Sequence, residues 1–366
     1  MYYRSQIFLI ALVAFAGCVD APAPLIRSYE EAWRVNFAEQ FDGPDIELYL
    51  AGAKPVSDGS LLLVVSKHGY SIPSTGIFVI KISRAGEVAG TVTLSEEYEM
   101  RGLYEDSDGL LLTFQIDNNL PNYIQYRIDA ALNTQEIPFT FNSPSTFYRV
   151  DFTPAGILII EYDGNLEGMR IKRFTYDGTQ EFDIGHNNPP LRSFPWIDGN
   201  RMFFLDPIEP DTMVIHSIDQ VDGRIHWRKT YTSTQLFGKE GIWLGQSFIM
   251  NGFICASYYE NDPKRFNLAT INPWNGRLRS SIRTTVETQD EWPQLAALTR
   301  DGGCILRTSA DGLSWLYKTD AAGTIGWTGQ FGGYARPVET ESGDLFVITD
   351  QLVIKLDARK GRFLTN

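Results

Sequence analysis

Five basic residues recur at a similar place in the chain, each a few positions before the glycine of a short turn. They are Lys54, Arg101, Arg149, Arg192 and Arg336. Guanidinium groups pair bidentately with carboxylate, sulfate or phosphate, so five such side chains around one opening form an anion site. The alternative is structural, because the same groups can tie neighbouring repeats together through acids such as Glu97, Glu99 and Glu339. Both interpretations require an architecture that gathers these positions.

Other candidate chemistry is sparse. The sequence has no GxSxG, HExxH, CxxC, P-loop or GxGxxG motif. The run Asp106-Ser107-Asp108-Gly109 is too short for a calcium loop and predicts a tight hairpin. Acidic segments at Glu260–Asp262 and Glu287–Glu291 offer carboxylates for acid–base chemistry, although such segments are most often simply solvated. We expect no metal and no cofactor, since the four histidines lack metal-ligand spacing: His68, His186, His216 and His226.

A repeat supplies the architecture. A turn followed by an apolar run occurs seven times, at Asp58-Gly59, Asp108-Gly109, Ala155-Gly156, Asp198-Gly199, Asn251-Gly252, Asp301-Gly302 and Ser342-Gly343. The six intervals between the first and last of these glycines average about 47 residues, the length of a four-stranded propeller blade. Apolar runs such as LLLVV and LLLTF are typical of strands that are buried on both faces.

A second series of turns lies out of phase with the first. Strand patterns such as IKIS and FTYD lead into Gly86, Asn133, Gly178, Gly223, Gly276, Gly323 and Gly361. Each repeat therefore contains two hairpins, which predicts an all-β fold: a seven-bladed β-propeller of four-stranded antiparallel blades. In this arrangement the stretch SIDQVDGRIHWRKTY, residues 217–231, is the hairpin between the third and fourth strands of the fourth blade.

The same stretch resembles a known repeat. Ser217, Asp219, Gly223 and Trp227 match the tryptophan-docking pattern of the PQQ-like, quinoprotein-type β-propellers. Partial matches lie at Thr270-x-Asn272-x-x-Asn275-Gly276, Lys355-x-Asp357-x-x-Lys360-Gly361 and Lys318-x-Asp320-x-x-Gly323-x-x-x-Trp327. The first two have Ser280 and Thr365 in place of Trp, and the third is one residue short. The resemblance implies the propeller fold, but the adjacent cysteine pair often found in the quinone-using members is absent.

The N-terminal part of the folded region parallels an outer strand. Ala32-Trp33-Arg34-Val35-Asn36-Phe37 matches residues 226–231 in its Trp-Arg pair and closing aromatic, whereas the last repeat ends soon after its turn. We therefore expect this N-terminal strand to complete the seventh blade and close the ring, which removes an open edge. Eight blades, with this segment in a degenerate extra one, are the alternative.

The first seventeen residues, MYYRSQIFLIALVAFAG, have the charged start and short apolar core of a signal peptide. The apolar core is too short to span a bilayer. Phe15-Ala16-Gly17-Cys18 resembles the lipobox of bacterial lipoproteins, with Phe15 where Leu is usual, which implies that Cys18 carries a lipid. An ordinary secretory signal is the alternative. We predict a signal peptide over 1–17, a lipidated, proline-containing tether over 18–28 and the propeller over 29–366, in the bacterial cell envelope on the periplasmic or cell-surface side.

Net charge bears on the class of partner, and the positions of the cysteines bear on disulfide formation. The formal net charge of −13 argues against a nucleic-acid partner. Cys255 and Cys304 occupy equivalent places in neighbouring repeats, and packed sheets lie about 10 Å apart, too far for a disulfide, so we expect buried free thiols.

These observations favour a non-catalytic binding or scaffold protein. The expected partner is an envelope protein or an acidic glycan, with membrane contact through the lipid. Loops containing Lys67-His68-Gly69-Tyr70, Tyr162-Asp163 and Tyr258-Tyr259-Glu260 are expected beside the basic residues, where aromatic and polar groups suit sugar or peptide recognition. The alternative is a propeller-type lyase or glycosidase, for which the sequence shows no converging acid–base set.

Overall fold

The computed structural model describes most of the chain from residue 28 to residue 359. The described residues are 28–41, 46–69, 72–95, 99–106, 109–115, 122–140, 149–153, 156–162, 169–185, 196–198, 201–242, 247–250, 252–261, 264–286, 293–340, 343–349 and 351–359. The expected signal peptide and Cys18 lie outside this set, so the N-terminal boundaries stay predictions.

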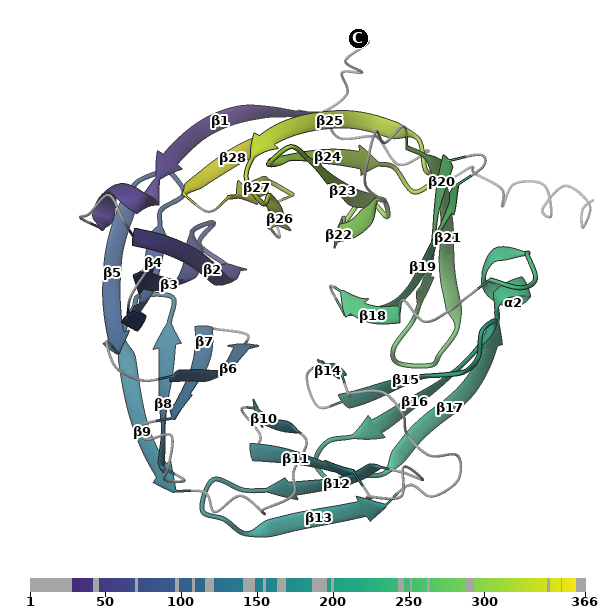
Figure 1. Cartoon of the computed structure of the whole chain (residues 1–366), viewed down its shortest axis with the longest axis horizontal. Helices are drawn as coiled ribbons and strands as arrows, with labels where there is room; N and C mark the ends of the chain where they lie inside the picture. Colours follow the sequence, from purple (N-terminus) through teal and green to yellow (C-terminus); the bar gives the residue numbers. More distant parts are fainter. Residues whose placement is uncertain are drawn as a thin grey trace, which may run out of the picture.

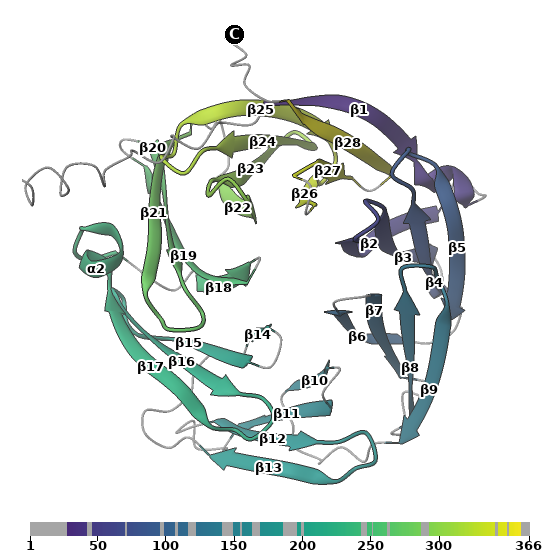
Figure 2. The same cartoon turned by 180° about the vertical axis from the view of Figure 1, so that it is seen from behind.

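The protein is a seven-bladed β-propeller, as the repeat predicts. Seven four-stranded antiparallel sheets stand around a ring, with the first strand of each blade innermost (Figures 1 and 2). Besides the strands, the described part contains the 3₁₀ helix η1 (Phe37–Gln40) and the short helix α2 (Ser233–Phe237). No helix within these residues is long and apolar enough to cross a membrane.

The strands follow the chain blade by blade. Blade 1 consists of β2 (Ile46–Pro55), β3 (Leu61–Gly69), β4 (Ile72–Ile82) and β5 (Val88–Ser95). Blade 2 consists of β6 (Glu99–Asp106), β7 (Gly109–Gln115), β8 (Asn122–Asp129) and β9 (Thr134–Thr140). Blade 3 consists of β10 (Arg149–Thr153), β11 (Gly156–Tyr162), β12 (Met169–Phe174) and β13 (Gln180–Gly185). Blade 4 consists of β14 (Trp196–Asp198), β15 (Arg201–Glu209), β16 (Thr212–Asp219) and β17 (Ile225–Thr232).

The other three blades complete the ring. Blade 5 consists of β18 (Ser247–Met250), β19 (Phe253–Asn261), β20 (Lys264–Ile271) and β21 (Leu278–Thr285). Blade 6 consists of β22 (Gln294–Leu298), β23 (Cys304–Ala310), β24 (Leu313–Thr319) and β25 (Ile325–Gly332). Blade 7 consists of β26 (Arg336–Glu339), β27 (Leu345–Ile348), β28 (Leu352–Arg359) and β1 (Ser28–Asn36).

Strand β1 closes the ring. It pairs antiparallel with β28, from Ser28 opposite Arg359 to Asn36 opposite Leu352. The N-terminal strand is therefore the outer strand of the seventh blade, which confirms the predicted closure and rules out the eight-bladed alternative. The hairpin at residues 217–231 is formed by β16 and β17, also as predicted.

The core lies between the blades. In β3, Leu62 and Val64 pack towards blade 2, whereas Leu61 and Leu63 pack towards Phe346 of blade 7, and all are fully buried. Alternate residues of a strand point to opposite faces of its sheet, so an uninterrupted apolar run fits a strand that is covered on both faces. Full burial of each such side chain contributes about 1.5–3 kcal/mol.

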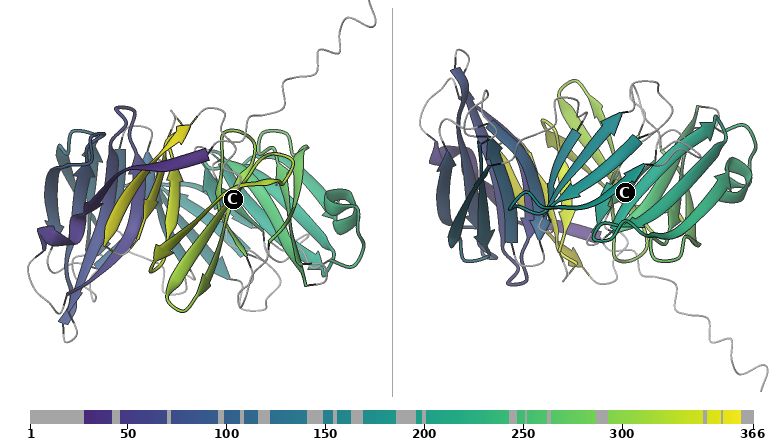
Figure 3. Two further views of the ribbon diagram at one scale, coloured as in Figure 1. Left: turned by 90° about the horizontal axis from the view of Figure 1, so that it is seen from above. Right: turned by 90° about the horizontal axis from the view of Figure 1, so that it is seen from below.

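Two kinds of hairpin turn lie on one face of the disc, which we call the turn face. They join the first strand of a blade to the second and the third to the fourth, and because neighbouring strands are antiparallel, both kinds end on the same side (Figure 3). The Asp219 carboxylate holds one such turn, since it accepts hydrogen bonds from the backbone N–H groups of Val221 and Asp222. At the DSDG run the strands β6 and β7 pair as far as Asp106 opposite Gly109, and the two residues between them lie outside the described set.

Indole groups join blades through these turns. Trp227 Nε1 donates to the Pro273 carbonyl of blade 5 at 2.9 Å. Trp33 Nε1 of the closing strand donates to the Arg84 carbonyl of blade 1 at 3.0 Å. The two tryptophans thus occupy equivalent positions on outer strands, as the parallel between their sequences indicates.

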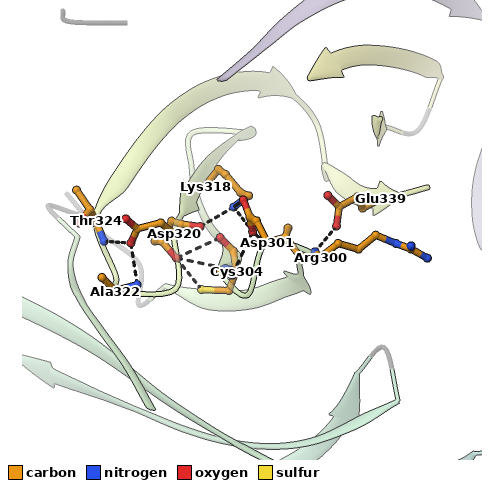
Figure 4. Close-up of polar contacts among 11 residues, drawn as sticks. Arg300, Asp301, Cys304, Lys318, Asp320, Ala322, Thr324 and Glu339 are labelled. Carbon is orange, nitrogen blue, oxygen red and sulfur yellow. Dashed lines mark hydrogen bonds and ion pairs between the residues drawn. The ribbon is translucent and has the colours of Figure 1, made fainter. Parts of the chain in front are cut away.

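Lysine–aspartate pairs link the third strand of several blades to the first turn. Lys318 Nζ lies 2.7 Å from Asp301 Oδ2, and both side chains are buried (Figure 4). The equivalent pairs are Lys81–Asp58 at 2.9 Å and Lys355–Asp344 at 3.1 Å. Lys81 also donates to the Ala130 carbonyl in blade 2, so this group crosses a blade boundary.

The two cysteines of the described region are free and buried, as predicted. Both belong to the apolar cluster between blades 5 and 6. Burial raises the pKa of the Cys255 thiol to about 12 and that of the Cys304 thiol to about 11, because the thiolate form is poorly solvated there.

Candidate anion-binding cavity

A cavity of ≈ 870 Å³ lies among blades 5, 6, 7 and 1. Inner strands β18, β22, β26 and β2 all contribute to its wall, and the turn at 299–303 brings it to the turn face. Part of the lining is apolar, from residues such as Ala297, Leu298, Pro337 and Val338, and polar groups make up the rest. This volume is in the range of sites that bind small organic ligands.

Three arginines supply most of the charge of the cavity. Arg279, Arg300 and Arg336 line it, and Glu339 is the one acidic residue among the described lining residues. The local balance is therefore +2, from three positive and one negative group, on a chain with a net charge of −13. Arginine groups beside apolar walls can pair with a carboxylate, sulfate or phosphate while the rest of the ligand contacts the wall.

Glu339 is part of a link between blades 6 and 7. Its Oε2 accepts a hydrogen bond of 2.7 Å from the backbone N–H of Arg300 (Figure 4). The bond fixes the turn after β22 against the end of β26, so the backbone beneath the Arg300 side chain is held in place. Within the described part of the chain, Arg336 is half-buried and its side chain makes no hydrogen bond or ion pair.

Arg279 is positioned by an aromatic ring. Its guanidinium carbon lies 4.2 Å from the centroid of the Phe253 ring, in blade 5. A cation over a ring face gains about 0.5–2 kcal/mol, depending on its exposure. The planar group keeps its N–H donors available at the ring edge, where an oxyanion can meet them.

The structure places the five basic residues of the sequence analysis differently. Arg336 begins β26 and lines the cavity. Lys54 lies in β2 and is not among the lining residues, although its neighbours Ala53 and Pro55 are. Lys54 pairs across the sheet with Leu62, which packs towards blade 2, so its side chain faces away from blade 7.

The sequences Lys54-Pro55-Val56 and Arg336-Pro337-Val338 are alike, each a basic residue followed by Pro and Val, but they are not structurally equivalent. The last pair before the turn is Pro55 with Leu61 in blade 1 and Glu339 with Leu345 in blade 7. Arg336 therefore corresponds to Gly52, two residues before Lys54. The sequence match suggested a shared position, and the turn geometry shows an offset.

The side chains of the other three basic residues lie outside the described part of the structure. The backbone of Arg101 is described, and it lies at the irregularity between Met100 and Gly102 in β6. Arg149 is the first residue of β10, opposite Ile160. Arg192 falls in the undescribed range 186–195. Convergence of all five residues on one opening stays a prediction.

Several residues expected in loops belong to strands instead. Lys67, His68 and Gly69 end β3, Tyr162 ends β11, and Tyr258, Tyr259 and Glu260 lie within β19. Tyr258 is buried and its hydroxyl donates to Glu260 Oε1 at 3.2 Å. The strands are longer than the sequence suggests because their partners extend equally far, as with Asn261 opposite Lys264.

The histidines with described side chains lie in blade 4. His216 is buried in β16, with its Nε2 3.8 Å from Asp206 Oδ2, and His226 Nε2 lies 3.1 Å from Asp219 Oδ2. Among the described residues, no group of three or more His, Cys, Asp or Glu side chains could hold a metal ion.

Sequence reasoning missed Arg279 and Arg300. Each lies beside a turn motif: Arg300 precedes the Asp301-Gly302 turn, and Arg279 follows the turn at Gly276. The usable signal was a basic residue beside a turn, rather than one at the start of an inner strand.

Comparisons with known proteins support the fold. No family model matches the sequence, and no curated protein matches it. An uncharacterised protein from Listeria monocytogenes EGD-e has a similar structure, with a TM-score of 0.50 and 13% identity over 87% of this chain and 97% of that chain. BamB from Moraxella catarrhalis has a TM-score of 0.42 and 11% sequence identity, over 90% of this chain and 100% of that chain.

A catalytically inactive virginiamycin B lyase from Staphylococcus aureus with quinupristin gives a TM-score of 0.44 and 16% identity, over 90% of this chain and 99% of that chain. BamB and this lyase are β-propeller proteins. By its own sheet topology the chain is a β-propeller, and it has an arginine-lined cavity. Membership of the PQQ-like group stays a prediction that rests on the docking motif.

Proposed function

We propose that this protein is a lipid-anchored binding protein of the bacterial cell envelope, and that its cavity holds an acidic ligand. The observation that carries the proposal is the group formed by Arg279, Arg300 and Arg336 in a cavity with a single described carboxylate. The ligand class is a small organic anion or a short acidic glycan, whose charged groups contact the arginines and whose carbon skeleton contacts the apolar wall.

The lining favours binding over catalysis. Hydrolysis or elimination on a sugar needs a general acid and a general base that face the same bond. Glu339 is the one carboxylate in the described lining, and one of its oxygens already accepts the Arg300 amide. The proposal therefore gives the cavity a recognition role.

Titration with acidic oligosaccharides tests this proposal. We would measure binding of uronic-acid and sulfated oligosaccharides by calorimetry, with neutral oligosaccharides of the same length alongside. Arg300→Ala combined with Arg336→Ala removes two charge-assisted contacts, and each such contact contributes about tenfold to the affinity. The matched control is Arg84→Ala, an exposed arginine on the turn face that does not line the cavity.

The expected result is binding of acidic but not neutral ligands, weakened about a hundredfold in the double variant and also weakened by added salt. Arg84→Ala should bind as the unaltered protein does. Equal binding of acidic ligands by the unaltered protein and the double variant would overturn the proposed site, as would turnover of the oligosaccharide.

The envelope location needs its own experiment. Cells grown with a labelled fatty acid should yield labelled protein, and Cys18→Ala should abolish the label and release the protein from the membrane fraction. Label that persists in the variant would contradict attachment at this residue.

A further inference from the structure

Two neighbouring turns on the turn face share a five-residue pattern. They are Val221-Asp222-Gly223-Arg224-Ile225 in blade 4 and Trp274-Asn275-Gly276-Arg277-Leu278 in blade 5, here called the paired tips. Four of the seven exposed large hydrophobic side chains in the described structure belong to them: Val221 at 48%, Ile225 at 46%, Trp274 at 70% and Leu278 at 45%. Such side chains are scattered elsewhere but gathered here.

Trp274 is held in its exposed position. Arg201 of blade 4 lies over the indole, with its guanidinium carbon 4.2 Å from the ring centroid. Its Nη1 also donates to the carbonyls of Pro273 at 3.1 Å and Trp274 at 3.3 Å. The contact joins the start of β15 in blade 4 to the tip of blade 5 and holds the indole against the Arg201 guanidinium. The ring therefore presents its free side and edge to whatever meets the turn face.

The paired tips are basic on an acidic protein. The segments 219–229 and 272–279 contain five Arg and Lys residues and two Asp residues, a balance of +3, whereas the whole chain has −13. Asp219 is engaged by the turn N–H groups and by His226 at 3.1 Å. Arg224 and Arg277 are exposed, and neither side chain makes an ion pair within the described residues.

We propose that the paired tips dock the protein on an anionic membrane surface. Exposed Trp, Leu, Ile and Val side chains enter the headgroup region, and the arginines meet lipid phosphates. These side chains stand on turns that end the blades, and none of them lines the cavity described above. Exposed apolar side chains with basic neighbours suit a bilayer interface, which needs no matching pocket.

The course of β1 supports a membrane as the occupant. Ser28 pairs with Arg359 at the end of β28, so the described chain begins on the turn face. Cys18 lies ten residues earlier, and a chain of that length reaches at most about 35 Å. A lipid on Cys18, as in the proposed function, brings the turn face near the bilayer. This step rests on that anchor, while the exposure and charge of the tips do not.

Fluorescence quenching by brominated lipids tests contact at one residue. The full-length protein is bound to vesicles of phosphatidylcholine and phosphatidylglycerol, with brominated or ordinary acyl chains. The N-terminal 32 residues contain no tryptophan, so their own insertion gives no signal. We expect a quenched component that disappears in Trp274→Phe and persists in Trp196→Phe. Trp196 is 43% exposed and begins β14, at the opposite face.

Neutralising the two exposed arginines of the paired tips provides the second readout. Each basic residue near an anionic surface contributes about fivefold in affinity, so Arg224→Gln with Arg277→Gln should weaken tip contact about thirtyfold and remove the quenching. Tyr334→Ala is the matched control, since Tyr334 is 58% exposed and stacks with Arg307 at 3.7 Å, but lies beyond β25 on the opposite face. It should leave the quenching unchanged.

Two outcomes would overturn the proposal. One is equal Trp274 emission with brominated and ordinary lipids while the protein is bound to the vesicles. That result would indicate that the paired tips contact a protein partner instead of lipid. The other is quenching that survives the double arginine variant. The quenching test does not depend on the cavity, because Arg300→Ala with Arg336→Ala should not alter the quenching. The oligosaccharide titration contains no lipid, so the cavity can be tested separately from the paired tips.

Discussion

The indole of Trp33 lies directly on Gly86 of the neighbouring blade. A Cβ added to Gly86 would be 2.6 Å from the Trp33 ring, and the glycine has a φ of +87°. The same relationship joins Gly276 to Trp227, where an added Cβ would be 3.0 Å from the ring. Glycine in these turns therefore does two things: it adopts a left-handed backbone and leaves room for an indole from the preceding blade.

Alanine at these turns should separate the two roles. Gly86→Ala should lower the free energy of unfolding by about 2–4 kcal/mol, since backbone strain and displacement of the indole add together. Gly178→Ala is the control, because Gly178 has a φ of +88° with nothing within 4 Å of its added Cβ. It should cost about 1–2 kcal/mol in denaturant titrations. Equal losses would show that the indole contact carries no energy.

The buried pair of Lys318 and Asp301 should be costly to break. Asp301→Asn keeps the hydrogen-bond acceptor of the turn but leaves the ammonium group of Lys318, whose side chain is 0% exposed, without its counter-charge. We expect a loss of about 3–5 kcal/mol in unfolding free energy. Adding Lys318→Met should restore most of it, measured as a double-mutant cycle. Additive losses in the double variant would contradict the pairing.

Acid should weaken the first blade through Asp58. Burial raises the pKa of this carboxyl, but hydrogen bonds from Ser60 and the contact with Lys81 outweigh it and lower the pKa to about 2, from 3.8. A folded-state pKa below the unfolded value means that the stabilisation is present above about pH 4 and is lost as the pH falls through 2. Thermal unfolding from pH 5 to pH 2 should show a smaller decline for Asp58→Asn than for Glu136→Gln, an exposed acid. Identical slopes would refute this contribution.

The buried thiols should be inert in the folded protein. The thiolate is the reactive form, and burial raises the pKa of Cys255 to about 12 and of Cys304 to about 11. At pH 8, iodoacetamide should therefore modify neither residue until denaturant is added. Peptide mass spectrometry separates the sites. Rapid labelling of Cys255 without denaturant would indicate local opening between blades 5 and 6.

Local turn chemistry explains why the fold was predictable. Asp-Gly and Asn-Gly turns depend on only a few neighbouring residues, so each hairpin can be predicted from the sequence. The match between Trp33 and Trp227 likewise predicts the closing strand. The cavity was less readable, because Arg279, Arg300 and Arg336 come from three blades. Their proximity depends on packing between sheets. The offset between Lys54 and Arg336 arises from where each turn begins, which glycine spacing alone does not define.

Strand β1 also determines when the protein can finish folding. Among the described strands it is the first to be synthesised, and its partner β28 is the last. Six blades can form as their own hairpins emerge, but β1 has an unpaired edge until β28 has been synthesised. The final pairing spans more than 300 residues of chain, so loop-closure entropy opposes it until the other blades have curved the ring. The slowest structural step should therefore be the meeting of the two chain ends.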